Sequence, residues 1–312
     1  MSKLDERQVI EIFQRAFGNK KFVSEDVETF QIGKNFGVIK TDTLVASTDV
    51  PPKMDLVDVA RKSVVASVSD FAAKGVRPLY CIISVSMPKN FSKPKVAQLA
   101  KGFQIASKEF GFRILGGDTN RAKELVISVT LVGMAGKITP RNGSRVGDRI
   151  VVTGPFGLSS AGLEIILNGK IAASKFQSQA KKAVLHPMPR LDFGIRAANL
   201  VSAAMDSSDG LSTCLVEMAE QSKKKFSLTF APGVDGLQEF ASSNRLDFLD
   251  LIFNGGEEYE MVITVPSSNM NKLKKLAKEQ KIHLIEIGRV QRGSGVVLQK
   301  TEIKNGGWSH KF

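Results

Sequence analysis

The 312-residue sequence contains only two cysteines, three histidines and one tryptophan. Cys81 and Cys214 are isolated in apolar or helical contexts, which excludes a disulfide framework and a cysteine-based zinc site. His186, His283 and His310 have no spacing typical of metal ligands. We therefore expect two core cysteines in a reducing compartment, and no metal centre built on histidine or cysteine.

The sequence also lacks long apolar runs and the common nucleotide-binding motifs. No segment approaches the roughly 18 apolar residues that span a bilayer, and residues 1–7 are too charged for a secretory signal. It has neither a Gly-x-x-x-x-Gly-Lys-Ser/Thr loop nor a Gly-x-Gly-x-x-Gly fingerprint. No serine or cysteine has the setting of a catalytic nucleophile. We expect a cytoplasmic protein without membrane association and without covalent catalysis.

The composition predicts a two-domain α/β protein. Hydrophobic residues make up 42% of the chain and aromatic residues 7%, with 27 glycines for tight turns. A chain of this length fits two domains of ordinary size. The polar segment 137–144 contains a proline and a glycine, so we expect domains at 1–140 and 141–312.

The formal net charge of +13 raises the possibility of a nucleic-acid partner. The lysines, however, lie in scattered helical stretches without interleaved aromatic residues, which is typical of solvated helix faces. Nucleic acid is therefore an unlikely partner, and the charge favours a small polyanionic substrate.

Hydrophobic periodicity predicts alternating helices and strands. We expect helices at about 4–17, 57–74, 94–110, 159–167 and 267–280, and strands at about 36–39, 80–87, 124–134, 149–154, 200–205, 226–230, 261–265, 283–287 and 296–298. In the helix 57–74, Ser63, Ser67 and Asp70 form a second stripe, which is either a solvated face or part of a site. Gly116-Gly117-Asp118 follows a strand and is either a simple turn or the tip of a binding site.

Aspartates gather at the ends of the predicted elements. Asp206 and Asp209 flank a predicted helix start, where a capping role is an adequate explanation for one pair. Four further acids lie at element ends or on a stripe of small residues: Asp26, Asp42, Asp70 and Asp118. If these carboxylates converge, Mg²⁺ is the expected counterion, since it accepts one or two carboxylates together with phosphate oxygens. Such a centre suits phosphoryl transfer.

These motifs, in this order, resemble the thiamine-monophosphate kinases of the aminoimidazole-ribonucleotide-synthetase-like superfamily. The resemblance covers nearly the whole chain and rests on six segments: Glu25-Asp26, Thr41 to Val45, Ser69 to Gly75, Gly116 to Thr119, Asp206 to Leu211 and Gly255 to Glu260. It implies ATP-dependent transfer of the γ-phosphate to thiamine monophosphate, giving thiamine diphosphate and ADP. It further implies a homodimer whose N-terminal sheets pair into a shared barrel, with nucleotide in a cleft near the interface.

The resemblance also assigns roles to individual residues. The implied Mg²⁺ ligands are Asp26, Asp42, Asp70, Asp118, Asp206 and Asp209, with Thr41 assisting. The implied ATP contacts are Gly117, Asp118, Arg141 and Ser208, where Arg141 offers a bidentate fork to phosphate. The implied thiamine-side contacts are Asp49, Glu257 and Trp308, where an aromatic plane suits a cationic thiazolium. A structural alternative for Trp308 is a C-terminal plug on the core.

Five positions differ from the usual residues of that family: Ser24 replaces a glycine, Lys40 a small Ser or Thr, Asp49 a histidine, Lys74 a methionine and Glu258 an aspartate. Two other readings stay open. One is a different ATP-using synthetase of the same superfamily, such as an aminoimidazole ribonucleotide synthetase. The other is a non-catalytic, basic nucleic-acid-binding homologue, which a steep loss of binding with salt would reveal.

Overall fold

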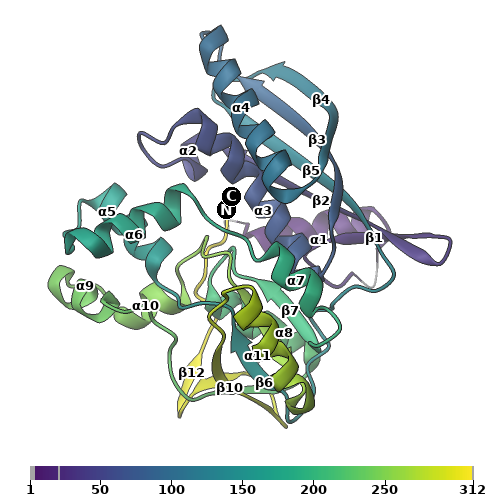
Figure 1. Cartoon of the computed structure of the whole chain (residues 1–312), viewed down its shortest axis with the longest axis vertical. Helices are drawn as coiled ribbons and strands as arrows, with labels where there is room; N and C mark the ends of the chain where they lie inside the picture. Colours follow the sequence, from purple (N-terminus) through teal and green to yellow (C-terminus); the bar gives the residue numbers. More distant parts are fainter. Residues whose placement is uncertain (1–3, 20–21, 311–312) are drawn as a thin grey trace.

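The computed structural model describes residues 4–19 and 22–310, which form two β-sheets with helices around and between them (Figure 1). The first sheet has the order β1-β2-β5-β3-β4 and the second β12-β11-β8-β10-β6-β9-β7. The strands are β1 (Glu28–Ile32), β2 (Asn35–Val45), β3 (Pro78–Met87), β4 (Arg113–Arg121), β5 (Val126–Ala135), β6 (Arg149–Val152), β7 (Ala203–Asp206), β8 (Lys225–Leu228), β9 (Met261–Val265), β10 (Ile285–Gln291), β11 (Val296–Leu298) and β12 (Thr301–Ile303). The α/β architecture predicted from the sequence is confirmed.

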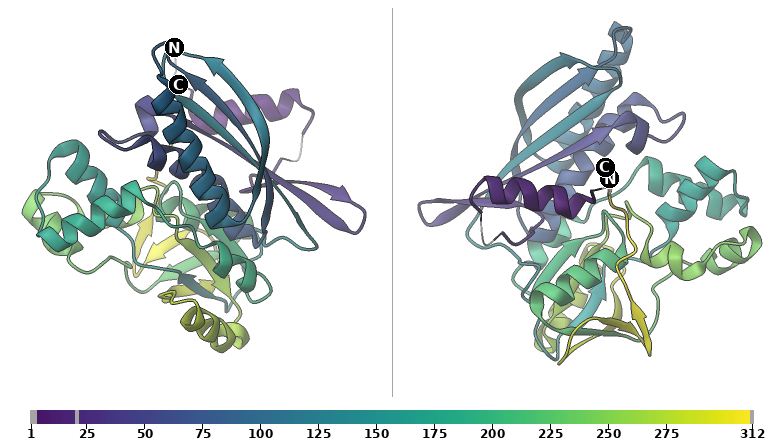
Figure 2. Two further views of the ribbon diagram at one scale, coloured as in Figure 1. Left: turned by 45° about the horizontal axis from the view of Figure 1, so that its top comes forward. Right: turned by 180° about the vertical axis from the view of Figure 1, so that it is seen from behind.

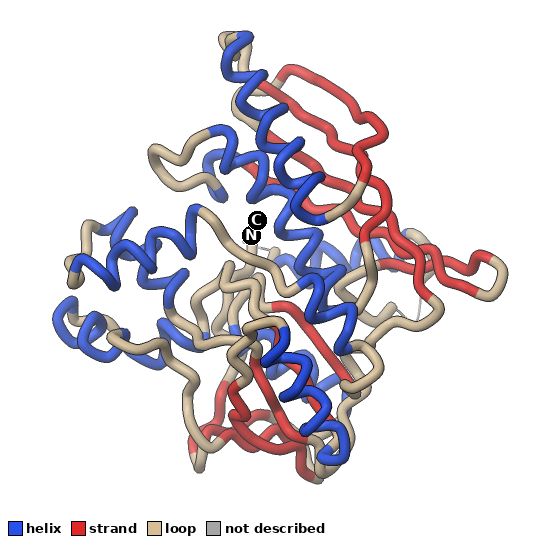
Figure 3. The backbone as a smooth tube through the Cα atoms, in the orientation of Figure 1, coloured by secondary structure: helices blue, strands red, loops and turns tan. Residues whose placement is uncertain are grey.

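The helices of the described residues lie mostly between or beside the two sheets (Figure 3). They are α1 (Glu6–Ala16), α2 (Ala46–Asp49), α3 (Leu56–Lys74), α4 (Lys93–Phe110), α5 (Leu158–Asn168), α6 (Ser174–Leu185), α7 (Leu191–Ala197), α8 (Leu211–Ser222), α9 (Leu237–Asn244), α10 (Phe248–Phe253), a short 3₁₀ helix (Ser267–Asn269) and α11 (Met270–Glu279). Within residues 4–19 and 22–310, no helix combines the length and the apolar character needed to cross a membrane.

In the described part of the chain, α3 and α4 cover one face of the first sheet. Alternate residues of β5, including Ile127, Val129 and Leu131, are fully buried on the side where α3 and α4 pack. The alternation follows from the two-residue period of a strand. The opposite face carries exposed apolar side chains such as Ile82 and Met134. Within residues 4–19 and 22–310, that opposite face is therefore left uncovered.

Both faces of the second sheet are covered. Along β6, Val151 belongs to the core shared with the first sheet, whereas Ile150 and Val152 belong to a second core on the other side. Such strands, buried on both faces, read in the sequence as continuous apolar runs. The second sheet is thus fixed between two hydrophobic layers.

Helix α3 joins the two halves of the molecule. It packs against α4, β2 and β5 of the first half and against α7 and β7 of the second. It ends at Gly75, whose φ of 69° is the left-handed conformation that glycine favours at a helix C-terminus. A side chain there would also meet Ala198. Because α3 touches both sheets, its polar residues are held at the junction.

The two ends of the described chain meet beside this junction, as two views agree (Figure 2). The backbone amide of His310 donates to Glu6 Oε2 at 3.2 Å, which ties the C-terminal segment to α1. The C-terminal segment is therefore held beside α1.

Two expectations from the sequence are wrong in detail. Gly116, Gly117 and Asp118 lie inside the edge strand β4, so this segment is neither a turn nor a strand tip. The stripe of Ser63, Ser67 and Asp70 is not solvated, because all three residues are buried. In both cases the local sequence is compatible with more than one structure, and tertiary packing determines which one forms.

Candidate functional site

Three aspartates from distant parts of the chain converge at the junction. Asp26 precedes β1, Asp70 lies on α3 and Asp206 ends β7, and one carboxylate oxygen from each lies within 4.8 Å of the others. All three side chains are buried. Among the described residues, Asp206 Oδ2 has no hydrogen-bond partner. A buried cluster of carboxylate oxygens with one oxygen left open fits a hard divalent cation such as Mg²⁺.

Burial gives these carboxyls unusual proton affinities. It raises the pKa of Asp206 to about 7, with a further contribution from the charge of Asp26. It likewise raises the pKa of Asp70 well above its ordinary value, although Lys40 opposes this. For Asp26 burial acts in the same direction, but the charges of Lys74 and Arg141 outweigh it and the pKa is lowered. Because their pKa values are raised, Asp70 and Asp206 tend to hold protons when no metal is bound. A cation that binds to them would therefore displace a proton.

Three basic side chains enter the acidic cluster. Lys74 Nζ is fully buried and lies 2.5 Å from Glu25 Oε2 and 2.7 Å from Asp26 Oδ2. Arg141 donates from both Nε, at 2.8 Å, and Nη2 to Asp26 Oδ1. The predicted bidentate fork of Arg141 is thus directed at a carboxylate of the chain itself.

The third base, Lys40, lies on β2 beside Asp42. Its Nζ is 2.9 Å from Asp70 Oδ2 and 3.3 Å from Asp42 Oδ1. Burial would lower the pKa of Lys40, but the charges of Asp70 and Asp42 raise it above its ordinary value. The other oxygen of Asp42 accepts a hydrogen bond from Ser67 Oγ at 2.6 Å. Asp42 thus joins the cluster through Lys40.

Thr41 does not bring its side chain to the cluster. Neighbouring residues of a strand point to opposite faces, so Thr41 faces the uncovered side of the sheet while Asp42 faces α3. There Thr130 Oγ1 donates to Thr41 Oγ1 at 3.1 Å. The predicted assistance of Thr41 therefore finds no support in the position of its hydroxyl within this chain.

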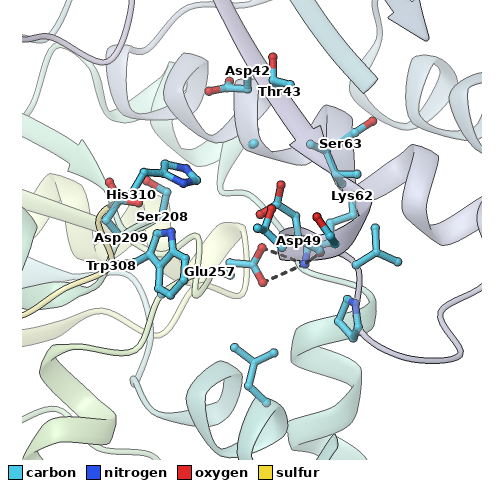
Figure 4. A pocket seen from close by; sticks show the side chains of 18 of the residues that line it. Asp42, Thr43, Asp49, Lys62, Ser63, Ser208, Asp209, Glu257, Trp308 and His310 are labelled. Carbon is cyan, nitrogen blue, oxygen red and sulfur yellow. Dashed lines mark hydrogen bonds and ion pairs between the residues drawn. The ribbon is translucent and has the colours of Figure 1, made fainter. Parts of the chain in front are cut away.

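A cavity of about 530 Å³ lies next to Asp42, between the two halves of the chain. Its lining includes Asp42, Thr43, Asp49, Lys62 and Ser63 from the first half, and Ser208, Asp209, Glu257 and Trp308 from the second. These side chains surround one space (Figure 4). Its volume is in the range of sites for small organic ligands. The structure therefore brings the predicted acceptor residues together.

Lys62 and Glu257, which both line this cavity, form an ion pair. Lys62 Nζ is 2.8 Å from Glu257 Oε1 and also donates to the backbone oxygen of Asp49 at 2.8 Å. The Asp49 carboxylate accepts from the Val45 amide at 2.7 Å, which closes the short helix α2. Asp49 therefore serves the local fold as well as lining the cavity.

Trp308 lies at the edge of the cavity and is 60% exposed. Its backbone amide donates to Asp209 O at 2.9 Å, so the chain end is fixed to the loop that follows β7. The alternative role, a plug packed on the core, is wrong, because most of the indole faces solvent or the cavity. An exposed aromatic side chain beside a carboxylate is available for a ligand.

The segment Gly255 to Glu260 contains three glutamates, and each has different contacts. Glu257 faces the cavity, whereas Glu258 accepts from the amides of Gly157 and Ser159 at the start of α5, at 2.7 and 3.0 Å. Burial raises the pKa of Glu258 to about 8. Glu260 is paired with Arg190. The pattern of acids in the sequence therefore contains one cavity residue and two structural ones.

Asp209 and Ser208 lie in the loop between β7 and α8, and both line the cavity. Burial raises the pKa of Asp209 to about 6. The capping alternative for the acidic pair is not realised, because the N-cap of α8 is Gly210 and has no side-chain hydrogen bond. Asp206 and Asp209 are therefore available to a ligand.

Asp118 lies apart from the other aspartates. It is exposed on edge strand β4, and the row through Gly117, Ile83 and Val129 leads to Asp42 three strands away. At about 4.8 Å per strand this is roughly 14 Å. Gly117 has a structural reason of its own, since a Cβ there would lie 1.7 Å from the Ile83 backbone oxygen. Within one chain, Asp118 does not join the cluster.

A second cavity of about 460 Å³ borders the cluster at Asp26. It is lined by Glu25, Asp26, Val27, Glu28, Ile39, Lys40, Thr41 and Thr130. Asp26 and Lys40 border this cavity, whereas Asp42 and Asp209 border the first. Acidic residues of the junction thus border two cavities, which is an arrangement suited to a donor and an acceptor.

Sequence reasoning did not find the roles of Lys62 or of the basic residues in the cluster. Lys62 and Lys74 occur on the amphipathic helix α3, where lysines are usually solvated, yet both are buried here. No local signal marks them, because their partners Glu257, Glu25 and Asp26 are far away in the sequence.

The chain matches two family models in succession. Residues 24–135 match the N-terminal domain of AIR synthase related protein, and residues 145–300 match its C-terminal domain. The chain is 53% identical over 314 residues to a thiamine-monophosphate kinase of Nitrosopumilus maritimus, covering 99% of each chain. It is 30% identical over 316 residues to the thiamine-monophosphate kinase of Pyrococcus horikoshii, covering 99% of this chain and 97% of that one. A solved structure of AaThiL complexed with AMPPCP and TMP superposes with a TM-score of 0.88 at 26% identity, covering 98% and 97% of the two chains.

Proposed function

The chain belongs to the AIR synthase related family and, within it, to the thiamine-monophosphate kinases, and on this basis we propose that it transfers the γ-phosphate of ATP to thiamine monophosphate. The products are thiamine diphosphate and ADP. The observation that carries the proposal is the buried carboxylate cluster together with two cavities that acidic residues of the junction border. The AaThiL complex with AMPPCP and TMP supports the same pair of ligands. No observation favours a different synthetase or a nucleic-acid partner.

We propose that the cluster holds Mg²⁺ through Asp70 and Asp206, with Asp26, Asp42 and Asp209 nearby. The open oxygen of Asp206 and the oxygen-only donor set support this assignment. When bound, the metal neutralises charge on the phosphates during in-line transfer. The residues of the chain supply the orientation, because Asp70 lies on α3 and Asp42 and Asp206 lie on strands that pack against it.

In the cavity of about 530 Å³, Trp308 and Glu257 suit a thiamine ring system. The indole face attracts a cationic thiazolium, and the Glu257 carboxylate adds a complementary charge. Asp49 lines the same space. The acceptor phosphate would then point toward Asp42 and Asp209, on the side where the cluster lies.

The nucleotide is proposed to approach from the opposite side. Asp26 and Lys40 border the second cavity, whereas the predicted nucleotide contact Ser208 lines the first cavity beside Asp209. We assign Arg141 to the nucleotide side as well, since its Nη1 makes only a 3.3 Å contact with Ser24 Oγ. A guanidinium can bind carboxylate and phosphate oxygens at the same time.

A homodimer would explain the uncovered face of the first sheet. Exposed apolar residues gather there and on α1: Ile10, Ile12, Phe13, Phe17, Phe30, Ile82, Leu115 and Met134. Contiguous exposed apolar surface of this kind usually marks an interface. We propose that two such sheets pair into a shared barrel, which would give Gly117, Asp118 and Thr41 of one protomer access to the nucleotide site of its partner.

We also propose that the boundary between the two domains lies between residues 140 and 141.

We further propose a cytoplasmic location. The reaction consumes ATP, and Cys81 and Cys214 are buried free thiols.

The test is direct product analysis. Purified chain with Mg²⁺, ATP and thiamine monophosphate is expected to give thiamine diphosphate and ADP in equal amounts. Asp206→Asn should lower turnover about 100-fold or more, since it removes charge where phosphate is neutralised. Asp118→Asn should lower it as well if the partner site is complete only in the dimer. The matched control is Asp235→Asn, an exposed aspartate before α9, with normal turnover expected.

ADP without thiamine diphosphate would contradict the acceptor assignment. Normal turnover in Asp206→Asn would contradict the metal site.

A further inference from the structure

Lys40 lies between two carboxylates of the acidic cluster. Its ammonium group lies 2.9 Å from Asp70 Oδ2 and 3.3 Å from Asp42 Oδ1. The side chain is 24% exposed, so it reaches the cluster from the strand without sealing it. A cation between two carboxylates removes the repulsion that they would otherwise exert on each other.

The oxygens of Asp42 and Asp26 are also engaged by the chain itself. Asp42 Oδ2 accepts from Ser67 Oγ at 2.6 Å, so both oxygens of Asp42 have partners. Asp26 Oδ1 accepts from Arg141, and Asp26 Oδ2 lies 2.7 Å from Lys74 Nζ. Among the described residues, Asp206 Oδ2 is left without a hydrogen bond.

The distribution of charge therefore differs between two parts of the cluster. Around Asp26 and Asp42, basic side chains already supply the positive charge. Around Asp206 no basic side chain lies within ion-pair distance in the described chain. A buried carboxylate oxygen without a partner is unfavourable unless a ligand supplies one.

We propose that Lys40 is a tethered cation that takes the place of one divalent ion between Asp42 and Asp70. The chain consequently binds one ion fewer than its carboxylates could hold, and the ion that it does bind is centred on Asp206. The inference rests on the proposed function only in that the cluster binds divalent metal. Lys40 acts here as a positioning residue for the carboxylates and for the phosphates that share them.

The proposal is tested by counting bound Mn²⁺. Metal-free protein is titrated with Mn²⁺ in the presence of saturating AMPPCP, and free Mn²⁺ is measured by electron paramagnetic resonance. Lys40→Ser removes the ammonium and opens the position between Asp42 and Asp70, so it should bind one more Mn²⁺ per chain than the unmodified protein. Lys40→Arg keeps the charge and should leave the count unchanged.

Two further variants complete the design. Lys40→Met keeps most of the stem and removes the charge, so it provides a second reading of the gain if Lys40→Ser does not fold. Lys175→Ser changes an exposed lysine of α6 and is the matched control, with no change in the count expected. Far-UV circular dichroism verifies the fold of each variant.

Equal counts in the unmodified protein and in folded Lys40→Ser or Lys40→Met would overturn the proposal. A gain of one ion in Lys40→Arg would also overturn it, because the charge would then not be what excludes the ion. The formation of thiamine diphosphate is measured separately. If no thiamine diphosphate forms but the Mn²⁺ count changes as expected, the proposed function is overturned and the role of Lys40 stands. If thiamine diphosphate forms but the Mn²⁺ count does not change, the role of Lys40 is overturned and the proposed function stands.

Discussion

Replacing Lys74 by methionine should destabilise the chain through one buried carboxylate. Lys74 is fully buried, and its Nζ lies 2.7 Å from Asp26 Oδ2, whose side chain is fully buried as well. Removing one partner of such a pair leaves an uncompensated charge and costs about 3–5 kcal/mol. Arg141 still contacts Asp26 in the variant, so we expect the lower end, about 3 kcal/mol.

The assay is thermal unfolding followed by circular dichroism in excess chelator, so that no divalent ion replaces the missing ammonium. For a chain of 312 residues, an unfolding entropy of about 2.1 cal/mol/K per residue means that about 3 kcal/mol corresponds to a fall in Tm of roughly 5 °C. The double variant Asp26→Asn/Lys74→Met removes the stranded charge and should regain at least about half of the loss. Lys175→Met, on the exposed surface of α6, controls for the residue type.

A Tm of Lys74→Met within about 2 °C of the unmodified protein would refute this reasoning. So would a double variant that is less stable than Lys74→Met alone, because the cost would then not arise from the Asp26 carboxylate.

Three other outcomes follow from the same structure. The pKa of Asp206 is raised to about 7, so between about pH 4 and pH 7 the folded chain binds more protons than the unfolded chain, and metal-free Tm should fall as pH rises through this range. Added Mg²⁺ should accordingly raise Tm more at pH 7.5 than at pH 5.5; an equal effect at both would speak against it. Glu258→Gln removes a carboxyl whose pKa is raised to about 8, so urea unfolding should show the variant gaining stability relative to the unmodified protein from pH 5 to pH 8. Gly117→Ala puts a Cβ 1.7 Å from a backbone oxygen of β3 and should cost about 2 kcal/mol or more, whereas Gly116→Ala has open space and should cost less than about 0.5 kcal/mol in the same unfolding assay.

The regular elements of the fold could be predicted because their apolar periods are local. The strands at 261–265 and 296–298 have the predicted bounds, and the helix that ends at Gly75 stops at the residue expected. Helix α2, with four residues, was not predicted, because one turn carries no measurable period. Edge strand β4 was misread at its glycines, since close approach to β3 requires glycine there without any turn.

The candidate site was predictable as a set of acids but not as an arrangement. Asp26, Asp70 and Asp206 were recognised because carboxylates at element ends are unusual in so many places at once, and the structure brings them together. The position of Asp118 could not be predicted in this way, because its distance from the cluster depends on the order of the strands within the sheet. That order is a tertiary property, and a single sequence contains no direct record of it.

The basic residues explain why a chain with a high positive charge can contain such an acidic centre. Lys40, Lys74 and Arg141 each contact a carboxylate of the cluster and each come from a different segment. If these bases served only to balance charge, each carboxylate of the cluster would be paired with one of them. Asp206 Oδ2, however, has no hydrogen-bond partner in the described chain. The centre is therefore neutralised around its margin and left deficient in positive charge at one oxygen. A divalent ion that carries phosphates is the ligand that suits such a site, because the ion adds positive charge at Asp206 while Lys40, which borders the second cavity, remains able to meet a phosphate oxygen.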